Sequence, residues 1–138
     1  MTRIVLDTGP LVALLSARDA HHAWAQETIG QITSPLATCE AVLTEACFLL
    51  RHTKRGVDSI LALVVRGIIA PNFQLDAKAE TVRKLMIKYA SVPMSLADAC
   101  LVRMTELYAR TTVLTLDDDF RVYRRNGRQS VPVLMPEC

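Results

Sequence analysis

Short apolar runs alternate with longer amphipathic stretches along the whole chain. The apolar runs have the length and composition of buried strands, and we predict strands at residues 4–6, 36–38, 68–73, 112–116 and 131–134. The stretches between them have helical spacing and end signals, which predicts helices at residues 9–16, 21–32, 40–52, 56–67, 76–89, 95–109 and 117–124. Parallel strands require crossover connections of about this length, so the alternation predicts an α/β fold in which helices cover both faces of a parallel sheet.

The size and composition of the chain indicate one domain. It has 138 residues, of which 51% are hydrophobic and only 5 are glycine, so we expect a single packed domain over residues 1–138. Its longest apolar run, residues 60–65, is far shorter than the roughly 20 residues that span a bilayer. Asp7 ends the first apolar run too early for the core of a signal peptide. The 4 cysteines contain no C-x-x-C pair and are expected to be reduced core thiols, which together predicts a cytoplasmic protein.

Two of the predicted strands end in aspartate. Asp7 follows residues 4–6, and Asp117 follows residues 112–116. Ligand sites in open α/β sheets lie beyond the carboxyl ends of the strands, so both side chains are expected at the binding end of the sheet. Taken alone, each acid is more typical of a helix cap or a turn than of a ligand site.

Two further acids lie on predicted helices among apolar neighbours. Glu45 has apolar residues at the neighbouring helical positions 41, 42, 48 and 49, and Asp98 has them at 94, 101 and 102. An ionised carboxylate within an apolar stripe needs a cation, a metal ion or a raised pKa. The alternatives are that Glu45 lies at the edge of the stripe and reaches solvent, and that Asp98 bonds back to Ser95 in a capping box.

Four carboxylates that converge from separate elements repel one another unless a cation neutralises them. Oxygen-only ligands suit Mg²⁺ or Mn²⁺, with water completing the coordination shell. A metal held in this way positions a scissile phosphate and neutralises the charge that builds during in-line displacement. The sequence therefore predicts a metal-dependent phosphodiesterase, with Asp7, Glu45, Asp98 and Asp117 as metal ligands and catalytic residues.

Four short motifs, taken in this order, resemble those of the PIN-domain nucleases, and especially the VapC-type toxins of prokaryotic toxin-antitoxin pairs. They are IVLDT at residues 4–8, VLTE at 42–45, SLADA at 95–99 and TLDDDF at 115–120. The resemblance implies a three-layer α/β/α fold with a central, mostly parallel five-stranded sheet whose first and fourth strands are neighbours. It also implies a Mg²⁺- or Mn²⁺-dependent endoribonuclease that cleaves RNA, commonly tRNA or rRNA, forms a homodimer and is bound by a cognate antitoxin in its active-site groove.

Two departures from the family pattern affect the expected site. Many relatives carry serine or asparagine two places after the first acid, where this chain has Gly9, so Thr8 is the remaining polar candidate beside the metal. The acids at 117, 118 and 119 leave the fourth ligand open; the family pattern selects Asp117, with Asp119 as a supporting or second-metal group. The resemblance also implies that Thr115 hydrogen-bonds a ligand carboxylate, although an ordinary strand threonine fits the same position.

An arginine-rich segment follows these acids directly. Arg121, Arg124 and Arg125 are expected to hold the RNA backbone through salt-sensitive phosphate contacts. An ordinary solvated helix face fits the same residues, and the small net charge of +2 does not decide between the two interpretations.

Other fold families with acids at strand ends fit the sequence less well. A receiver domain requires paired acids after the first strand and a lysine after the last, and neither is present. A phosphatase of the haloacid dehalogenase type requires a second aspartate where Gly9 stands. Two alternatives within the PIN-like fold stay open: a nuclease for RNA processing outside a toxin-antitoxin pair, and a catalytically weak binding module.

Overall fold

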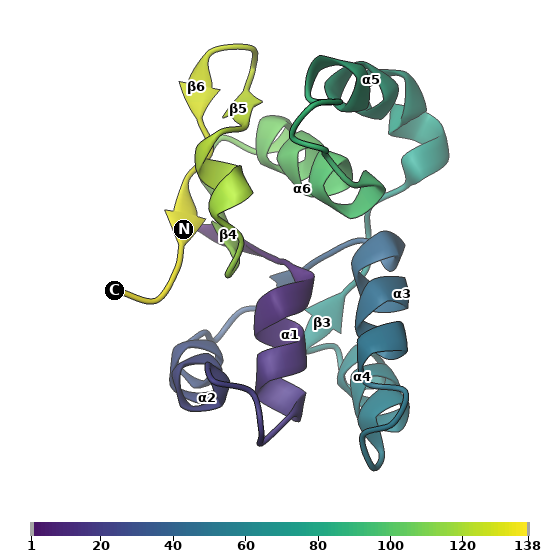
Figure 1. The fold of residues 1–138 in the computed structure, drawn as a ribbon, viewed down its shortest axis with the longest axis vertical. Coiled ribbons are helices and arrows are strands. Elements are labelled where there is room, and N and C mark those ends of the chain that lie inside the picture. Colours follow the sequence, from purple (N-terminus) through teal and green to yellow (C-terminus); the bar gives the residue numbers. More distant parts are fainter. Residues whose placement is uncertain (1, 138) are drawn as a thin grey trace.

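The computed structural model describes residues 2–137, and its centre is one sheet of five parallel strands (Figure 1). The strands are β1 (Arg3–Leu6), β2 (Leu36–Ala37), β3 (Ile69–Ala70), β4 (Thr111–Leu114) and β7 (Val133–Leu134), and their order across the sheet is β3-β2-β1-β4-β7. β1 pairs with β4 along its whole length, ending with Leu6 beside Leu114. The predicted parallel sheet and the predicted pairing of the first and fourth strands are confirmed.

Six α-helices connect and cover these strands. They are α1 (Thr8–Leu15), α2 (His22–Gly30), α3 (Glu40–Leu49), α4 (Gly56–Val65), α5 (Leu75–Lys88) and α6 (Leu96–Leu107). Their ends differ from the predicted ones by at most 3 residues. At the start of α5, Gln74 occupies the N-cap position, and Asp76 lies in the first turn, where its negative charge interacts favourably with the helix dipole.

The segment after β4 differs from the prediction of one helix over residues 117–124. It contains a single 3-10 turn, η1 (Asp118–Arg121), followed by an antiparallel hairpin of β5 (Arg124–Arg125) and β6 (Gln129–Ser130). Asn126 and Gly127 have φ angles of 50° and 83° and form the hairpin turn. An Asn-Gly pair is a strong hairpin signal, and here it outweighs the helical spacing of the residues before it.

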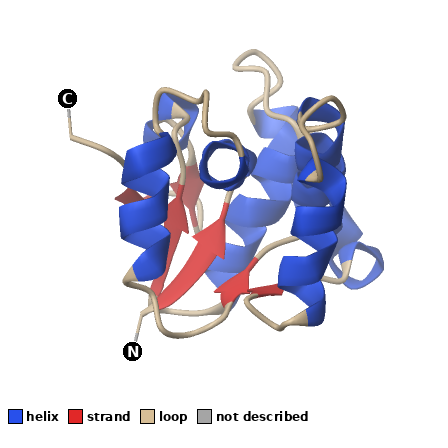
Figure 2. Cartoon of the chain, turned by 90° about the horizontal axis from the view of Figure 1, so that it is seen from below, coloured by secondary structure: helices blue, strands red, loops and turns tan. Residues whose placement is uncertain are grey.

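The core has two parts, one on each face of the sheet. Val5 and Leu6 are both fully buried and point to opposite faces. The Val5 face is covered by residues of α5 and α6 together with Phe120 and Tyr123, and the Leu6 face by residues of α1, α2 and α4. Figure 2 shows helices on both sides of the strands, which confirms the three-layer arrangement. Among residues 2–137, no helix is long and apolar enough to span a membrane.

Candidate metal centre

Six carboxylates line a cavity at the carboxyl ends of β1 and β4. The cavity has a volume of about 600 Å³, and its acidic lining comprises Asp7, Glu45, Asp98, Asp117, Asp118 and Asp119. Asp7 and Asp117 come from the ends of adjacent parallel strands, so their side chains share one edge of the sheet. α3 contributes Glu45 and α6 contributes Asp98. The structure thus brings to one place the four acids that the sequence singled out.

Asp7 is the most buried acid of this cavity, with 6% of its surface exposed. Its Oδ1 accepts a hydrogen bond of 2.8 Å from the Thr8 amide, which makes it the N-cap of α1, and its Oδ2 accepts one of 2.7 Å from the Thr115 hydroxyl. Burial raises the pKa of Asp7 to about 6, although the hydrogen bonds from Thr115 and Thr8 oppose the rise. A proton therefore competes for this carboxylate at a pH only slightly below neutral.

The Thr115 hydroxyl ties Asp7 to the segment that carries Asp117. It donates to Asp7 Oδ2 and accepts a hydrogen bond of 2.9 Å from the Asp117 amide. Thr115 itself is fully buried, so this bridge is shielded from water. One side chain thereby fixes the relative placement of two acids that are far apart in the sequence.

Asp98 lies in the first turn of α6 and contacts a buried tyrosine. Its amide donates to the hydroxyl of the N-cap residue Ser95 at 3.0 Å, and the Tyr123 hydroxyl donates to Asp98 Oδ2 at 2.7 Å. Burial raises the pKa of Asp98, while the hydrogen bonds from Tyr123 and Ser95 lower it and the negative charge of Asp117 raises it further. The capping geometry and a place at the cavity are thus compatible.

Tyr123 is a functional candidate that the sequence analysis did not identify. Its side chain is fully buried, and its ring packs edge-on against Tyr89 and Phe120 at centroid distances of 5.1 and 5.3 Å. A buried tyrosine usually finds a partner for its hydroxyl. The spacing from Phe120 marks Tyr123 as a core residue, but nothing in the sequence specifies Asp98 as its partner.

Asp117 and Asp119 are held together by a local hydrogen bond. Asp117 is the N-cap of η1, and its Oδ1 accepts a bond of 2.9 Å from the Asp119 amide. Asp118 points to solvent and lies 3.5 Å from the Arg121 guanidinium. Both Asp117 and Asp119 line the cavity, so either carboxylate is placed to serve as a ligand.

The environment of Glu45 differs from the predicted one. Glu45 is exposed, and its helical neighbours Phe48 and Leu49 are 60% and 53% exposed. The buried face of α3 is formed by Val42 and Ala46 instead. The prediction that Glu45 lies within a buried apolar stripe is therefore wrong, because its side of α3 faces solvent rather than the core. Glu45 reaches the cavity from its open side.

The three arginines expected to contact RNA occupy different environments. Arg121 is exposed, and Arg124 is half-buried and donates to backbone carbonyls, including that of Arg121 at 2.8 Å. Arg125 is only 7% exposed, and its guanidinium donates to the carbonyls of Tyr108 and Ala109, both at 3.2 Å. The prediction for Arg125 is wrong, since its charge is used to anchor the hairpin to the end of α6.

Thr8 and Gly9 explain the departure from the family pattern beside the first acid. A Cβ atom on Gly9 would lie 3.2 to 3.4 Å from the Leu116 side chain, so a larger polar residue requires Leu116 to move. The Thr8 hydroxyl lines the same cavity, is buried and has no hydrogen-bond partner among the described residues. An unpartnered buried hydroxyl is costly, which suits a role toward a bound group.

The donor chemistry of this cavity fits a hard divalent cation. Its lining offers carboxylate oxygens and the Thr8 hydroxyl, and such cations prefer oxygen ligands. As they are placed, no three acidic, histidine or cysteine side chains within residues 2–137 stand close enough to hold an ion. The charges of Asp98 and Asp117 contribute to the raised pKa of Asp7, which shows that these acids repel one another. The donor set therefore fits a divalent cation, whose positive charge would offset this repulsion.

Comparisons with known proteins support the same interpretation. The model of a family described as PIN domain matches residues 4–126. Ribonuclease VapC26 of Mycobacterium tuberculosis is 30% identical over 118 residues, which cover 83% of this chain and 86% of the relative. The crystal structure of Mycobacterium tuberculosis VapC20, described as a sarcin-ricin loop cleaving toxin, superposes with a TM-score of 0.75 at 20% identity. That match covers 86% of this chain and 93% of the VapC20 chain, and it shows the fold.

Proposed function

This chain belongs to the PIN-domain family and is a VapC-type ribonuclease toxin, and we propose that it is a Mg²⁺- or Mn²⁺-dependent endoribonuclease. The convergence of Asp7, Asp98 and Asp117 in one cavity carries this proposal. Two of these acids are held by buried hydroxyls, Asp7 by Thr115 and Asp98 by Tyr123. Such supporting hydrogen bonds orient ligand carboxylates at metal sites.

Each residue of the cavity has a distinct task in this proposal. Asp7, Asp98 and Asp117 would hold the metal, and Glu45 would act as a further ligand from the exposed side of the cavity. When bound, the metal neutralises the charge that builds on the phosphate and lowers the pKa of water. Asp119 supports Asp117 through its amide, and the Thr8 hydroxyl offers one further polar contact.

Metal removal tests the proposal directly. We expect the purified protein to cleave structured RNA in Mg²⁺ or Mn²⁺, to lose cleavage in EDTA and to regain it when either ion is restored, because the reaction needs a cation to neutralise the charge that builds on the phosphate. Cleavage is measured on gels with labelled RNA, and circular dichroism in EDTA checks that the protein stays folded. Full cleavage after EDTA treatment and exhaustive dialysis would refute the metal-dependent mechanism.

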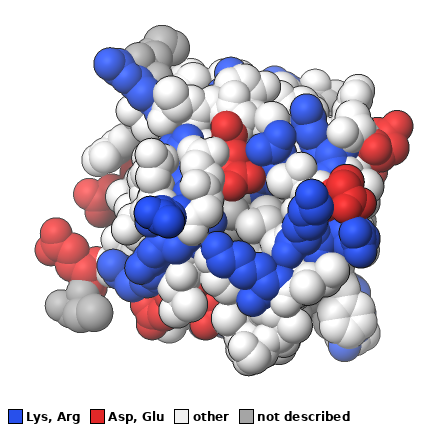
Figure 3. Space-filling view, turned by 90° about the horizontal axis from the view of Figure 1, so that it is seen from above, with Lys and Arg blue, Asp and Glu red and all other residues white. Residues whose placement is uncertain are grey.

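We also propose that Arg121 and Arg124 contact the RNA backbone. Arg121 is exposed and follows Asp119, which lines the acidic cavity, by two residues, and Arg124 is half-buried in the same segment. Figure 3 shows that Lys and Arg side chains outnumber Asp and Glu on the face that contains α5 and the β5–β6 hairpin. Phosphate contacts of this kind supply affinity without sequence preference.

Loss of the exposed arginine is expected to weaken RNA binding more than catalysis. Arg121→Gln should raise KM several-fold with little change in kcat, and it should reduce the salt dependence of log affinity by about 0.7. Steady-state cleavage and binding at several salt concentrations measure both effects. Arg18→Gln, which removes an exposed arginine between α1 and α2, is the matched control and should behave as wild type. An unchanged salt slope in Arg121→Gln protein would contradict the contact.

We further propose that the chain forms a homodimer and that a cognate antitoxin covers the acidic cavity. α3 and α4 leave large apolar side chains exposed, including Phe48 (60%), Leu61 (52%) and Val65 (86%). Exposed apolar surface of this kind is typical of a protein interface. Val65→Asp is expected to convert the dimer to a monomer in light scattering, with an unchanged circular dichroism spectrum. A wild-type protein that is monomeric at micromolar concentration would refute the dimer.

A further inference from the structure

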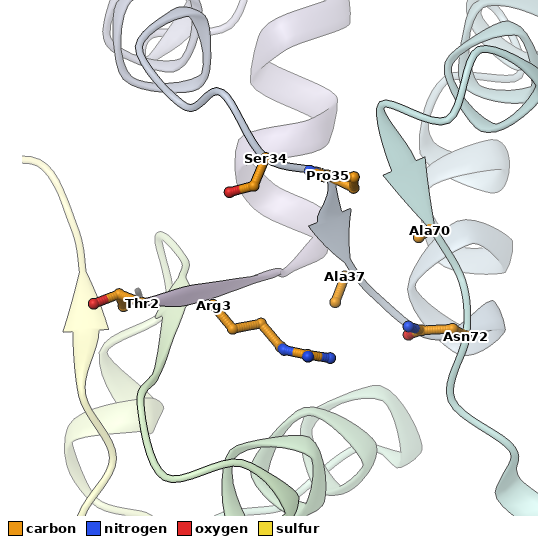
Figure 4. Close-up of a pocket in the computed structure, with 7 residues that line it drawn as sticks. All are labelled: Thr2, Arg3, Ser34, Pro35, Ala37, Ala70 and Asn72. Atoms are coloured by element: carbon orange, nitrogen blue, oxygen red, sulfur yellow. The ribbon is translucent and has the colours of Figure 1, made fainter.

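A second cavity lies on the α6 side of the sheet, away from the acidic site. It has a volume of about 380 Å³, within the range of small-molecule sites. Ala37 and Ala70 are adjacent on β2 and β3, and their small side chains leave this space open. Figure 4 shows Thr2 and Arg3 on one side of the opening, Ser34 at its upper edge and Asn72 on the other side. Among residues 2–137, no acidic side chain lines this cavity.

Arg3 supplies the positive charge of this cavity and determines which ligands the cavity can bind. Its side chain extends into the opening toward the side of Asn72 (Figure 4), and its guanidinium stacks on the Tyr108 ring at 3.6 Å from the centroid. Arg3 is half-buried, and within residues 2–137 its guanidinium forms no ion pair and donates no hydrogen bond. An arginine held in place by stacking, with its donors unused, is prepared to bind an oxyanion.

We propose that this cavity binds a nucleoside monophosphate. The phosphate pairs with the Arg3 guanidinium, and the Asn72 amide offers a second donor on the facing side. The Ser34 hydroxyl is available to the sugar, and the apolar floor of Ala37 and Ala70 accepts the flat face of a base. A bare phosphate or a short carboxylate would leave most of the 380 Å³ unfilled, so the volume favours the larger ligand.

This cavity and the acidic site are separate. Arg3 and Asp7 stand near opposite ends of β1, and the four residue steps between them span about 13 Å in a strand. One ligand of this size does not reach both. Binding at Arg3 is therefore measurable while the metal centre is disabled by EDTA, and its outcome is independent of whether the chain cleaves RNA.

Calorimetric titration of the full chain with AMP in EDTA tests the proposal. We expect saturable binding of AMP, weaker binding of inorganic phosphate, and at least about a 10-fold loss of AMP affinity in Arg3→Gln protein. Ala70→Leu fills the cavity without altering its charge and should also prevent binding. Arg66→Gln removes an exposed arginine at the end of α4 and should bind AMP as the wild type does.

Several outcomes would overturn the assignment. Circular dichroism and thermal unfolding first establish that each variant is folded. Absence of wild-type binding at millimolar AMP, or wild-type affinity in both Arg3→Gln and Ala70→Leu proteins, would show that the cavity is not the site. Equal affinity for succinate or inorganic phosphate would refute the nucleotide as the ligand.

Discussion

Asp98→Asn protein is expected to cleave RNA at least about 100-fold more slowly than wild type. The substitution keeps the shape of the side chain but removes the charge that a metal ligand supplies. Asparagine still accepts the hydrogen bond from the Tyr123 hydroxyl and can retain the packing around α6. The loss should therefore appear as a lower kcat with near-normal thermal stability, measured by single-turnover cleavage at saturating Mg²⁺.

Two further variants test whether Tyr123 orients Asp98 and whether the effect is specific to the acids of the cavity. Tyr123→Phe removes the hydroxyl that orients Asp98 but keeps the buried ring, so it should raise the Mg²⁺ concentration needed for half-maximal cleavage by about 10-fold. Asp76→Asn removes a surface acid from the first turn of α5 and should leave cleavage unchanged. Wild-type rates in Asp98→Asn protein would remove this residue from the metal centre. A wild-type metal requirement in Tyr123→Phe protein would refute the positioning role.

Asp7→Asn protein is expected to lose cleavage yet gain stability when no metal is bound. Burial raises the pKa of Asp7 from 3.8 to about 6, which corresponds to a destabilisation of roughly 3 kcal/mol once the carboxylate is ionised. Between these two values the folded state binds more protons than the unfolded state, so stability falls as pH rises and levels off above about pH 6. Below the unfolded value this contribution disappears.

Urea unfolding in EDTA at pH 4.5 and pH 7.5 measures this effect as a difference between variant and wild type. We expect Asp7→Asn to be more stable than wild type by about 1 to 3 kcal/mol at pH 7.5 and by much less at pH 4.5. The increase in stability is expected to fall short of the full value of about 3 kcal/mol, because the asparagine side chain accepts a weaker hydrogen bond from the Thr115 hydroxyl than the carboxylate does. Mg²⁺ should raise the free energy of unfolding of the wild type, which binds the ion, and should leave that of Asp7→Asn protein nearly unchanged. If Asp7→Asn protein is less stable than wild type at both pH values, the ionised Asp7 carboxylate does not destabilise the folded protein.

The fold and part of the site followed from local sequence patterns. Asp7 and Asp117 were placed correctly at one edge of the sheet because strand ends and parallel pairing determine that edge. Asp98 was placed because Ser95 begins its helix, which fixes the residue in the first turn. Such features depend on neighbouring residues and on the direction of strands, both of which a sequence records.

The remaining features depend on contacts between distant segments. The exposure of Glu45 is set by which side of α3 the rest of the chain covers, and helical spacing alone does not specify this. The partners of Tyr123 and Arg125 are Asp98 and the carbonyls after α6, which the hairpin brings close. Side-chain partners of this kind are decided by tertiary packing, so the sequence patterns identify neither the partner of Tyr123 nor that of Arg125.

The pairing of β1 with β4 also determines when during synthesis the acidic cavity can exist. Asp7 is synthesised well before Thr115, which fixes it, and Asp117, because these residues lie 108 and 110 positions later in the chain. A nascent chain that lacks β4 has neither the neighbouring strand nor the second strand-end acid. The cavity therefore cannot assemble before the segment that carries Thr115 and Asp117 has been made. A partly made copy that stops before β4 lacks the residues that complete the acidic cavity.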